Sequence, residues 1–214
     1  MKNWSNPIEA ELSDCHTRLL RQTNCWFTRA RAALLETLPC SRGCFRCCVG
    51  PFPITVLDAH LLRDGLDRLP SASRQAIQHR AMAQIEQFEQ QFPALRISPF
   101  LDQWDDSAID QVTARFHEAP CPALQEDGSC GVYEVRPLTC RLMGIPTSLD
   151  GIVQGACEIQ SFVPITRLST ALREEESALA TAEAAALTLL QQASGLSGEE
   201  FLLPYGFLPE LLFA

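Results

Sequence analysis

Four cysteines lie close together near the start of the chain, in the pattern Cys40-x3-Cys44-x2-Cys47-Cys48. Thiolates at spacings of two or three residues can converge on one metal centre within a single tight turn. Gly43 removes a side chain inside this turn and favours a sharp change of direction. Because Cys47 and Cys48 are adjacent, they cannot both point the same way in a regular strand. We therefore expect one of them to support the site from outside, to serve a second site or to remain free.

Four further cysteines follow beside turn residues, at Cys121, Cys130, Cys140 and Cys157. Eight clustered cysteines are enough for two tetrahedral thiolate sites, or for one cluster with spare thiols. Buried cysteine without metal is the alternative, but eight thiols concentrated at turns do not favour it. Cys15 and Cys25 lie within helical periodicity instead, and we expect both to be buried and inert.

The composition is that of an ordinary globular protein with an acidic balance. The 214 residues are 46% hydrophobic and 20% charged, and the net charge is -9. Nucleic acid and anionic lipid bind mainly through lysine and arginine, so we expect neither as a partner. We find no secretory signal and no apolar run of about 18 residues, which predicts a cytoplasmic protein without a membrane helix. In that reducing compartment ten cysteines favour metal or redox chemistry over disulfides.

Hydrophobic periodicity predicts a mainly α fold, with a single helical domain and an irregular cysteine-rich metal-binding region of loops and short strands. The helices are expected over residues 7–38, 56–69, 71–92, 107–117 and 168–194. Residues 120–155 are rich in proline and glycine, so we expect loops folded around metal rather than around a large core. In a single domain of residues 1–214, a metal-binding core over 38–160 then lies between flanking helices over 1–37 and 161–214.

Two short motifs and the C-terminal tail complete the predicted scaffold. Thr55 with Asp58, and Ser197 with Glu200, resemble capping boxes, and each predicts the start of a helix. The apolar tail FLLPYGFLPELLFA is expected to pack onto the helices. A contact with a partner protein or a second copy is the alternative for this tail.

Five parts of the sequence together resemble a known family: Cys40 to Cys48, Thr55 with Asp58, Cys121-Pro122-Ala123-Leu124, the segment CGVYEVRPLTCR from Cys130 to Arg141, and Cys157. They resemble the YkgJ-type cysteine-cluster family, a zinc- or iron-chelating domain, over roughly residues 38 to 160. The resemblance implies metal chelation by these cysteines and suggests an iron–sulfur oxidoreductase. A related cysteine block occurs in a flagellin lysine methylase, so a protein-modifying enzyme is a further alternative.

Thiolate ligands suit both zinc and iron–sulfur clusters. The dense first block resembles the sequential supply of ligands in iron–sulfur sites, and we expect a [4Fe–4S] cluster first. Its ligands would be Cys40, Cys44, either Cys47 or Cys48, and one downstream cysteine. Zinc stabilising a protein-interaction module is the alternative. The sequence leaves the protein partner or redox partner and the oligomeric state undetermined.

Three residues around Cys140 are candidates for supporting the bound group. Arg136 and Arg141 could stabilise thiolates and the negative charge of a cluster, or bind an anionic ligand nearby. An ordinary ion pair, for example with Glu134, is the alternative for the arginines. Tyr133 could donate its hydroxyl group to a sulfur atom, or could simply fill the core.

Overall fold

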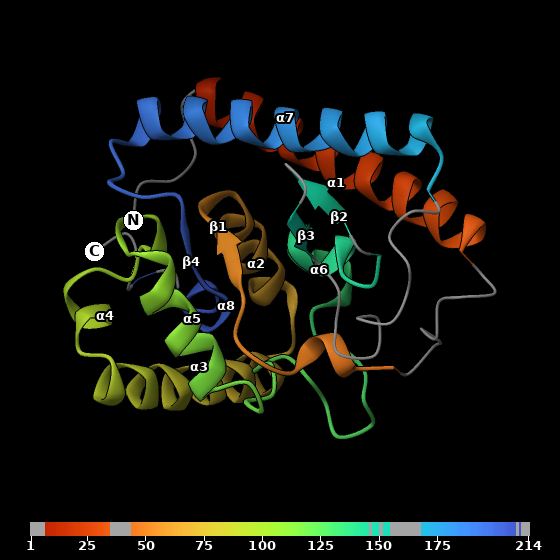
Figure 1. Ribbon diagram of the computed structural model, residues 1–214. Coiled ribbons are helices and arrows are strands. Elements are labelled where there is room, and N and C mark those ends of the chain that lie inside the picture. The colour runs from red at the N-terminus through yellow and green to blue at the C-terminus, as the bar shows by residue number, and fades with distance from the viewer. Residues whose placement is uncertain are drawn as a thin grey trace. The chain divides into compact units, whose positions relative to one another are not determined.

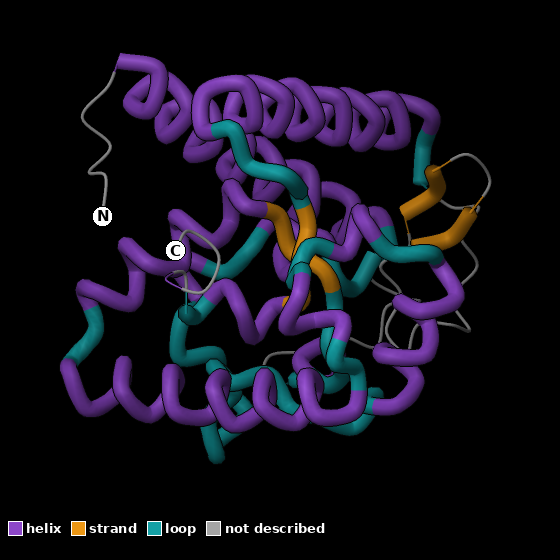
Figure 2. Tube along the Cα trace, turned by 90° about the vertical axis from the view of Figure 1, so that its left-hand side faces the viewer, coloured by secondary structure: helices purple, strands orange, loops and turns teal. Residues whose placement is uncertain are grey.

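Helices make up most of the chain that the structure describes, which confirms the prediction of a mainly α protein. The computed structural model describes residues 7–34, 44–145, 147–149, 152–154, 168–208 and 210. Its strands are short beside its helices (Figure 2). Contacts between Cα atoms divide the chain into two compact units. Unit 1 comprises Met1–Arg42 and Leu138–Leu196, and unit 2 comprises Gly43–Pro137 and Ser197–Ala214. The assignment of residues 38–160 to a metal-binding core remains a prediction.

Unit 1 contains two long helices that lie side by side (Figure 1). Its elements are α1 (Pro7–Ala33), α6 (Leu138–Leu142), β2 (Thr147–Leu149), β3 (Ile152–Gln154) and α7 (Thr170–Ser194). Strands β2 and β3 pair antiparallel, and α1 packs against both α7 and α6. Trp26 of α1 is fully buried, and its indole N–H donates to the carbonyl of Leu172 at 2.8 Å. This bond gives the polar edge of the buried ring a partner on the other long helix.

The ends of α7 follow their sequence signals. Ser169 precedes the helix, and its hydroxyl accepts a hydrogen bond from the N–H of Leu172. Gly195 follows the helix with φ of 69°, a left-handed conformation that favours glycine. The predicted stop at Gly195 is therefore confirmed. The first helix is a single element that ends at Ala33, and its predicted continuation to residue 38 lies outside the described residues.

Unit 2 contains an antiparallel pair of strands together with short and medium helices. In chain order its elements are η1 (Arg46–Cys48), β1 (Pro53–Thr55), α2 (Val56–Arg68), α3 (Ser71–Gln91), α4 (Ala94–Ile97), η2 (Leu101–Gln103), α5 (Asp106–Arg115), η3 (Tyr133–Val135), β4 (Glu200–Leu202) and α8 (Leu203–Gly206). Strand β1 pairs with β4, and Ile54 lies opposite Phe201 (Figure 1). This pairing joins the two chain segments that make up the unit.

The C-terminal apolar tail supplies much of the core of unit 2. Residues 201–208 are all buried, and the side chains of Phe201 and Phe207 are fully inaccessible to solvent. On α3, Ile77, Ala81, Ile85 and Phe88 follow one another at helical spacing and are also buried, whereas Phe92 at the end of the helix is half-buried. The prediction that the tail packs within the chain is therefore confirmed for residues 201–208.

Of the two predicted capping boxes, the one at Thr55 correctly marks the start of a helix but lacks the capping hydrogen bond, and the one at Ser197 is wrong. Thr55 occupies the N-cap of α2, but its buried hydroxyl makes no capping hydrogen bond. Glu200 begins strand β4 instead of following a helix start at Ser197. The N–H groups of Glu199 and Glu200 both donate to Asp102 at 2.9 Å, and pairing with β1 keeps the backbone extended. Long-range strand pairing therefore overrides the local capping pattern.

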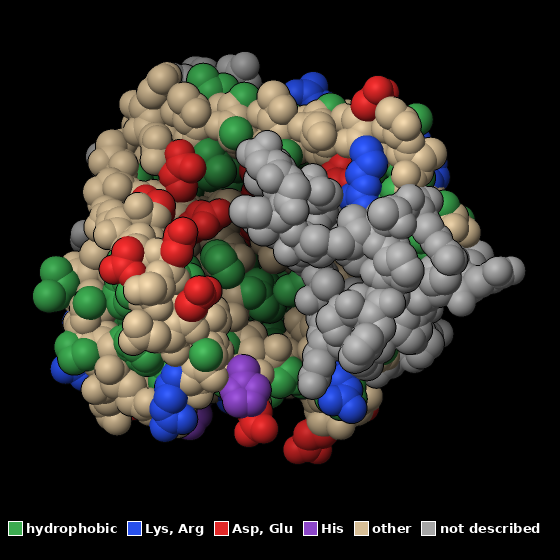
Figure 3. Space-filling model, in the orientation of Figure 1, with side chains coloured by type: hydrophobic (Ala, Val, Ile, Leu, Met, Phe, Trp, Pro, Cys, Tyr) green, Lys and Arg blue, Asp and Glu red, His purple; other side chains and the backbone are tan. Residues whose placement is uncertain are grey.

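The surface reflects the acidic composition of the chain. Acidic side chains gather in the left half of the face drawn in Figure 3, as expected from a net charge of -9. At β4, burial raises the pKa of Glu200, and the charges of Asp102 and Glu199 raise it further. No helix in the described part of the chain is long and apolar enough to cross a membrane.

The segment that carries η3 packs against α2 at a glycine. A Cβ atom at Gly65 would lie 2.2 Å from Cγ2 of Val135, far inside van der Waals contact. A larger residue at this position fits only if η3 moves away from α2. Because Tyr133 begins η3 and Arg136 follows it, this close packing fixes the backbone that carries both side chains.

Replacing Gly65 with alanine should lower the free energy of unfolding by about 1–3 kcal/mol, because the added methyl group overlaps Val135. The overlap outweighs the gain of about 1 kcal/mol that alanine brings to a helix interior. Urea unfolding of the metal-free protein measures the change. Gly65→Ala/Val135→Ala removes the overlapping Cγ atoms and should recover part of the loss. A Gly65→Ala variant as stable as the wild type would contradict the close contact.

Candidate metal centre

The adjacent cysteines Cys47 and Cys48 lie in a 3-10 turn, η1, rather than in a strand. The turn is closed by a hydrogen bond from the N–H of Cys48 to the carbonyl of Phe45, at 2.8 Å. The side chains of Cys47 and Cys48 are joined by a hydrogen bond between their thiols. The directional conflict that a strand would impose therefore does not arise, because the turn brings both sulfur atoms together.

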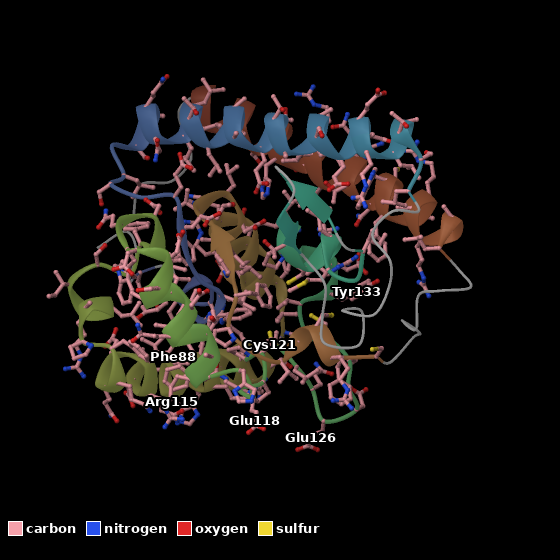
Figure 4. All side chains as sticks on the ribbon, viewed as in Figure 1. Phe88, Arg115, Glu118, Cys121, Glu126 and Tyr133 are labelled. Carbon is pink, nitrogen blue, oxygen red and sulfur yellow. The ribbon has the colours of Figure 1, made fainter. Side chains whose placement is uncertain are left out.

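A second cysteine-bearing segment is tied to this turn through the backbone. The N–H of Cys121 donates to the carbonyl of Cys48, and the N–H of Gly50 donates to the carbonyl of Ala119, each at 2.8 Å. Gly50 has φ of +90°, and a Cβ atom there would lie 3.1 Å from the carbonyl oxygen of His117. The glycine thus permits the close approach of the two segments. Figure 4 shows Cys121 beside the η1 turn.

After Cys121 the chain folds back on itself, and this brings Cys130 beside the residues that follow Cys121. The N–H of Gly131 donates to the carbonyl of Ala123 at 2.8 Å, and Leu124 forms a bridge with Cys130. At the tip, Gly128 has φ of 80° and the carboxylate of Asp127 accepts the N–H of Ser129 at 2.9 Å. These are the ordinary stabilising features of a tight turn. The fold-back places Cys130 within electrostatic reach of Cys121.

Burial is the main cause of the raised pKa of two of these thiols. It raises the pKa of Cys121 to about 12, and the charge of Cys130 adds to the shift, while the N–H of Ala123 opposes it. Burial also raises the pKa of Cys130, and the charge of Cys47 adds to this shift. For Cys47, the hydrogen bond with Cys48 comes first among the causes of a raised pKa, followed by burial. All three thiols are therefore disfavoured as free thiolates.

These interactions connect four thiols of unit 2 in the order Cys48, Cys47, Cys130 and Cys121. Each thiol interacts with the next one in this order. Among the described residues, no three histidine, cysteine or acidic side chains are arranged to hold a metal ion. A shared metal would therefore require rotation of the thiol side chains. The donor atoms of these residues are thiol sulfurs, which as thiolates suit both zinc and iron–sulfur clusters. The charged neighbours that shift their pKa values are other thiols and arginines.

Arg136 is held beside this row of thiols by Tyr133. Its guanidinium carbon lies 4.0 Å from the centre of the Tyr133 ring, and Nη1 donates to the Tyr133 carbonyl at 2.8 Å. The charge of Arg136 lowers the pKa of both Cys47 and Cys130. Tyr133 is 57% exposed, so the alternative that it fills the core is wrong.

Arg80 is a residue near the thiols that the sequence analysis missed. It lies on α3, its Nε donates to the carbonyl of Pro122 at 2.7 Å, and its charge lowers the pKa of Cys121. Gln84, one helical turn later, donates to the carbonyl of Pro120. Two polar residues four positions apart, beside the apolar face of α3, were the available sequence signal. No local sequence pattern links Arg80 and Gln84 with cysteines that follow much later in the chain.

The remaining candidates are distributed over both units. Cys44 is half-buried before η1 in unit 2, whereas Cys140 and Arg141 lie on α6 in unit 1, where Arg141 is buried. Cys40 and Cys157 lie outside the described residues. Their roles as ligands, and that of Arg141, stay predictions.

The two helix cysteines are less buried than expected. Cys15 is half-buried and Cys25 is exposed, so the prediction of a buried Cys25 is wrong. No cysteine in the described part of the chain forms a disulfide. The imidazole of His117 is also largely exposed and contacts the carbonyl of Ala114.

A mainly α scaffold that gathers thiols from separate turns defines a cysteine-cluster protein. Comparison with protein families supports this class, since residues 39–158 match the CxxCxxCC family, described as "Putative zinc- or iron-chelating domain". The match covers more than half of the chain, and the chain belongs to this metal-binding family. Comparisons with curated proteins and with solved structures found no match.

In metal-free protein at pH 8, iodoacetamide should modify Cys121 at least ~10-fold more slowly than Cys25, because Cys121 is half-buried and burial raises its pKa to about 12, whereas Cys25 is exposed. The thiolate is the reactive form, so the rate at Cys121 should keep rising as the pH is raised towards 11. Peptide mass spectrometry measures both rates, and the same reaction in urea provides the control. Equal rates at the two cysteines in folded protein would contradict the described burial.

Proposed function

We propose that the protein holds an iron–sulfur cluster, most simply [4Fe–4S], on cysteine thiolates and uses it in a redox or protein-modification role. The observation that carries this proposal is the backbone hydrogen bonding that brings the turn with Cys47 and Cys48 together with the segment that carries Cys121 and Cys130. Four thiolates are the usual ligand set of such a cluster. Membership of a zinc- or iron-chelating family supports metal binding at these residues.

The eight candidate cysteines exceed what one cluster needs. Unit 2 contains the interacting thiols and Cys44, which gives a choice of ligands within one unit. The other candidate ligands are Cys40, Cys140 and Cys157. The family resemblance implies that these cysteines also chelate metal, and eight thiols are enough for two tetrahedral sites.

Partial burial suits a group that exchanges electrons. Cys47, Cys48, Cys121 and Cys130 are all half-buried, so a group bound there would lie near the surface. When bound, an iron–sulfur cluster supplies one-electron chemistry, and burial and hydrogen bonds to sulfur set its potential. The N–H of Ala123 lies 3.4 Å from the sulfur of Cys121 and is one such donor. Free thiols also fit a cytoplasmic location, where disulfides are rare.

Zinc is the second candidate. The positions of the thiols in the chain favour it, because the thiols come in two pairs. Two of them come from the η1 turn and two from the segment that folds back after Cys121. Structural zinc sites commonly take paired ligands from two such places. In that case, zinc would stabilise the folded-back segment as part of a protein-interaction module.

Anaerobically purified protein should be brown and contain iron and acid-labile sulfide, because clusters of this kind absorb visible light and are sensitive to oxygen. Metal and sulfide analysis with an absorption spectrum makes the measurement. Colourless protein with stoichiometric zinc would overturn the iron–sulfur proposal in favour of zinc. Protein that takes up neither metal after reconstitution would overturn both.

Cys130→Ser should reduce bound metal below about half of the wild-type content, because it removes a thiolate from the interacting row. Cys25→Ser is the matched control, since Cys25 is an exposed thiol on α1 in the other unit. Metal per chain is measured after identical reconstitution. Full metal content in Cys130→Ser would remove this residue from the ligand set.

A further inference from the structure

Two arginines lie near the row of thiols, and each is tied to backbone near a cysteine. Arg80 donates to the carbonyl of Pro122, the residue directly after Cys121. Arg136 donates to the carbonyl of Tyr133, whose own N–H donates to the carbonyl of Cys130 at 3.3 Å. The charged groups are thus oriented by the same segment that carries the cysteines.

Separate elements of unit 2 hold these two charges in place. Arg80 projects from the long helix α3, and Gln84 on the same helix binds the neighbouring carbonyl of Pro120. Arg136 follows η3, which is held close to α2 by the contact between Gly65 and Val135. Its guanidinium also stacks on Tyr133. Both arginines are therefore anchored before any group binds.

A metal–thiolate centre carries negative charge, which nearby arginines can stabilise. Four thiolates around one divalent ion carry a net charge of about -2, and a thiolate-ligated iron–sulfur cluster is also anionic. Placing such a charge in a half-buried position is unfavourable unless positive charge lies nearby. Arg80 is bonded to the residue after Cys121, and Arg136 is bonded to Tyr133, whose N–H binds the carbonyl of Cys130, so positive charge is held near both cysteines of this segment.

We propose that Arg80 and Arg136 are positioning residues that hold positive charge against a metal–thiolate centre and so retain the bound metal. This inference rests on the proposed function and adds Arg80 to the site. It also gives Tyr133 the role of holding Arg136 through its ring and its carbonyl, rather than that of a donor to sulfur.

The test measures how fast reconstituted protein loses its metal to an excess of chelator. Arg80→Gln and Arg136→Gln should each release metal at least ~10-fold faster than the wild type, as expected for the loss of a residue supporting the ligands. Arg80→Lys and Arg136→Lys should remain within about threefold, since lysine keeps the charge without the guanidinium geometry. Arg74→Gln is the matched control, because Arg74 lies on α3 and pairs with Asp67 at 3.1 Å.

Two further measurements separate charge from folding. Tyr133→Leu changes an exposed side chain, so the protein should fold normally and still release metal faster than the wild type. If the bound group is an iron–sulfur cluster, either glutamine variant should lower its reduction potential, because loss of positive charge disfavours the reduced state. Circular dichroism of each metal-free variant verifies the fold.

The outcomes distinguish this inference from the proposed function on which it rests. A wild-type protein that binds neither iron nor zinc overturns the proposed function. A wild-type protein that binds metal, with glutamine variants releasing it as slowly as Arg74→Gln, overturns the role of the arginines alone. Lysine variants as fast as the glutamine variants would show that the hydrogen bonds act without the charge, and this also overturns the inference.

Discussion

The hydrogen bond from the N–H of Cys121 to the carbonyl of Cys48 is the contact on which the thiol arrangement depends. It joins two segments that are far apart in the chain, and the bond between Gly50 and Ala119 runs beside it. Each bond contributes only about 1 kcal/mol on its own. Their geometric effect is larger, because they fix the turn that carries Cys47 and Cys48 beside the segment that carries Cys121. Cys130 then joins through the fold-back of that segment.

A gathering of half-buried thiols is electrostatically unfavourable once they ionise. Burial and mutual interaction raise the pKa of Cys47, Cys121 and Cys130, so the metal-free protein keeps these groups neutral. Metal binding requires the thiolates, so it releases protons and must supply the compensating charge. In the proposed metal centre, the anchored arginines would reduce this cost from the protein side.

The fold was more predictable from the sequence than the site. Helices such as α3 and α7 have long apolar stripes and clear end signals, including Gly195, and local information is sufficient there. Strand β4 was missed because its extended backbone depends on β1, which no local pattern at Glu200 reveals.

At the site, cysteine spacing identified the thiols, but other features required the fold. The 3-10 turn at Cys47 and Cys48 brings together side chains that a strand would separate. Arg80 reaches Pro122 only because α3 packs near that segment, a relation encoded in tertiary contacts rather than in spacing. Arg136 was found because it lies next to the cysteine motif in the sequence.

The discontinuity of unit 2 has a consequence for the order in which the chain folds. Strand β1 needs β4, and the core needs Phe201 and Phe207, yet these residues are synthesised long after Gly43–Pro137. Closing so large a loop is entropically costly and slows folding. During synthesis, the segments that bear the cysteines therefore emerge while their enclosing core is still incomplete. The thiols at Cys47, Cys48, Cys121 and Cys130 are therefore synthesised before the residues that complete the core of their own unit.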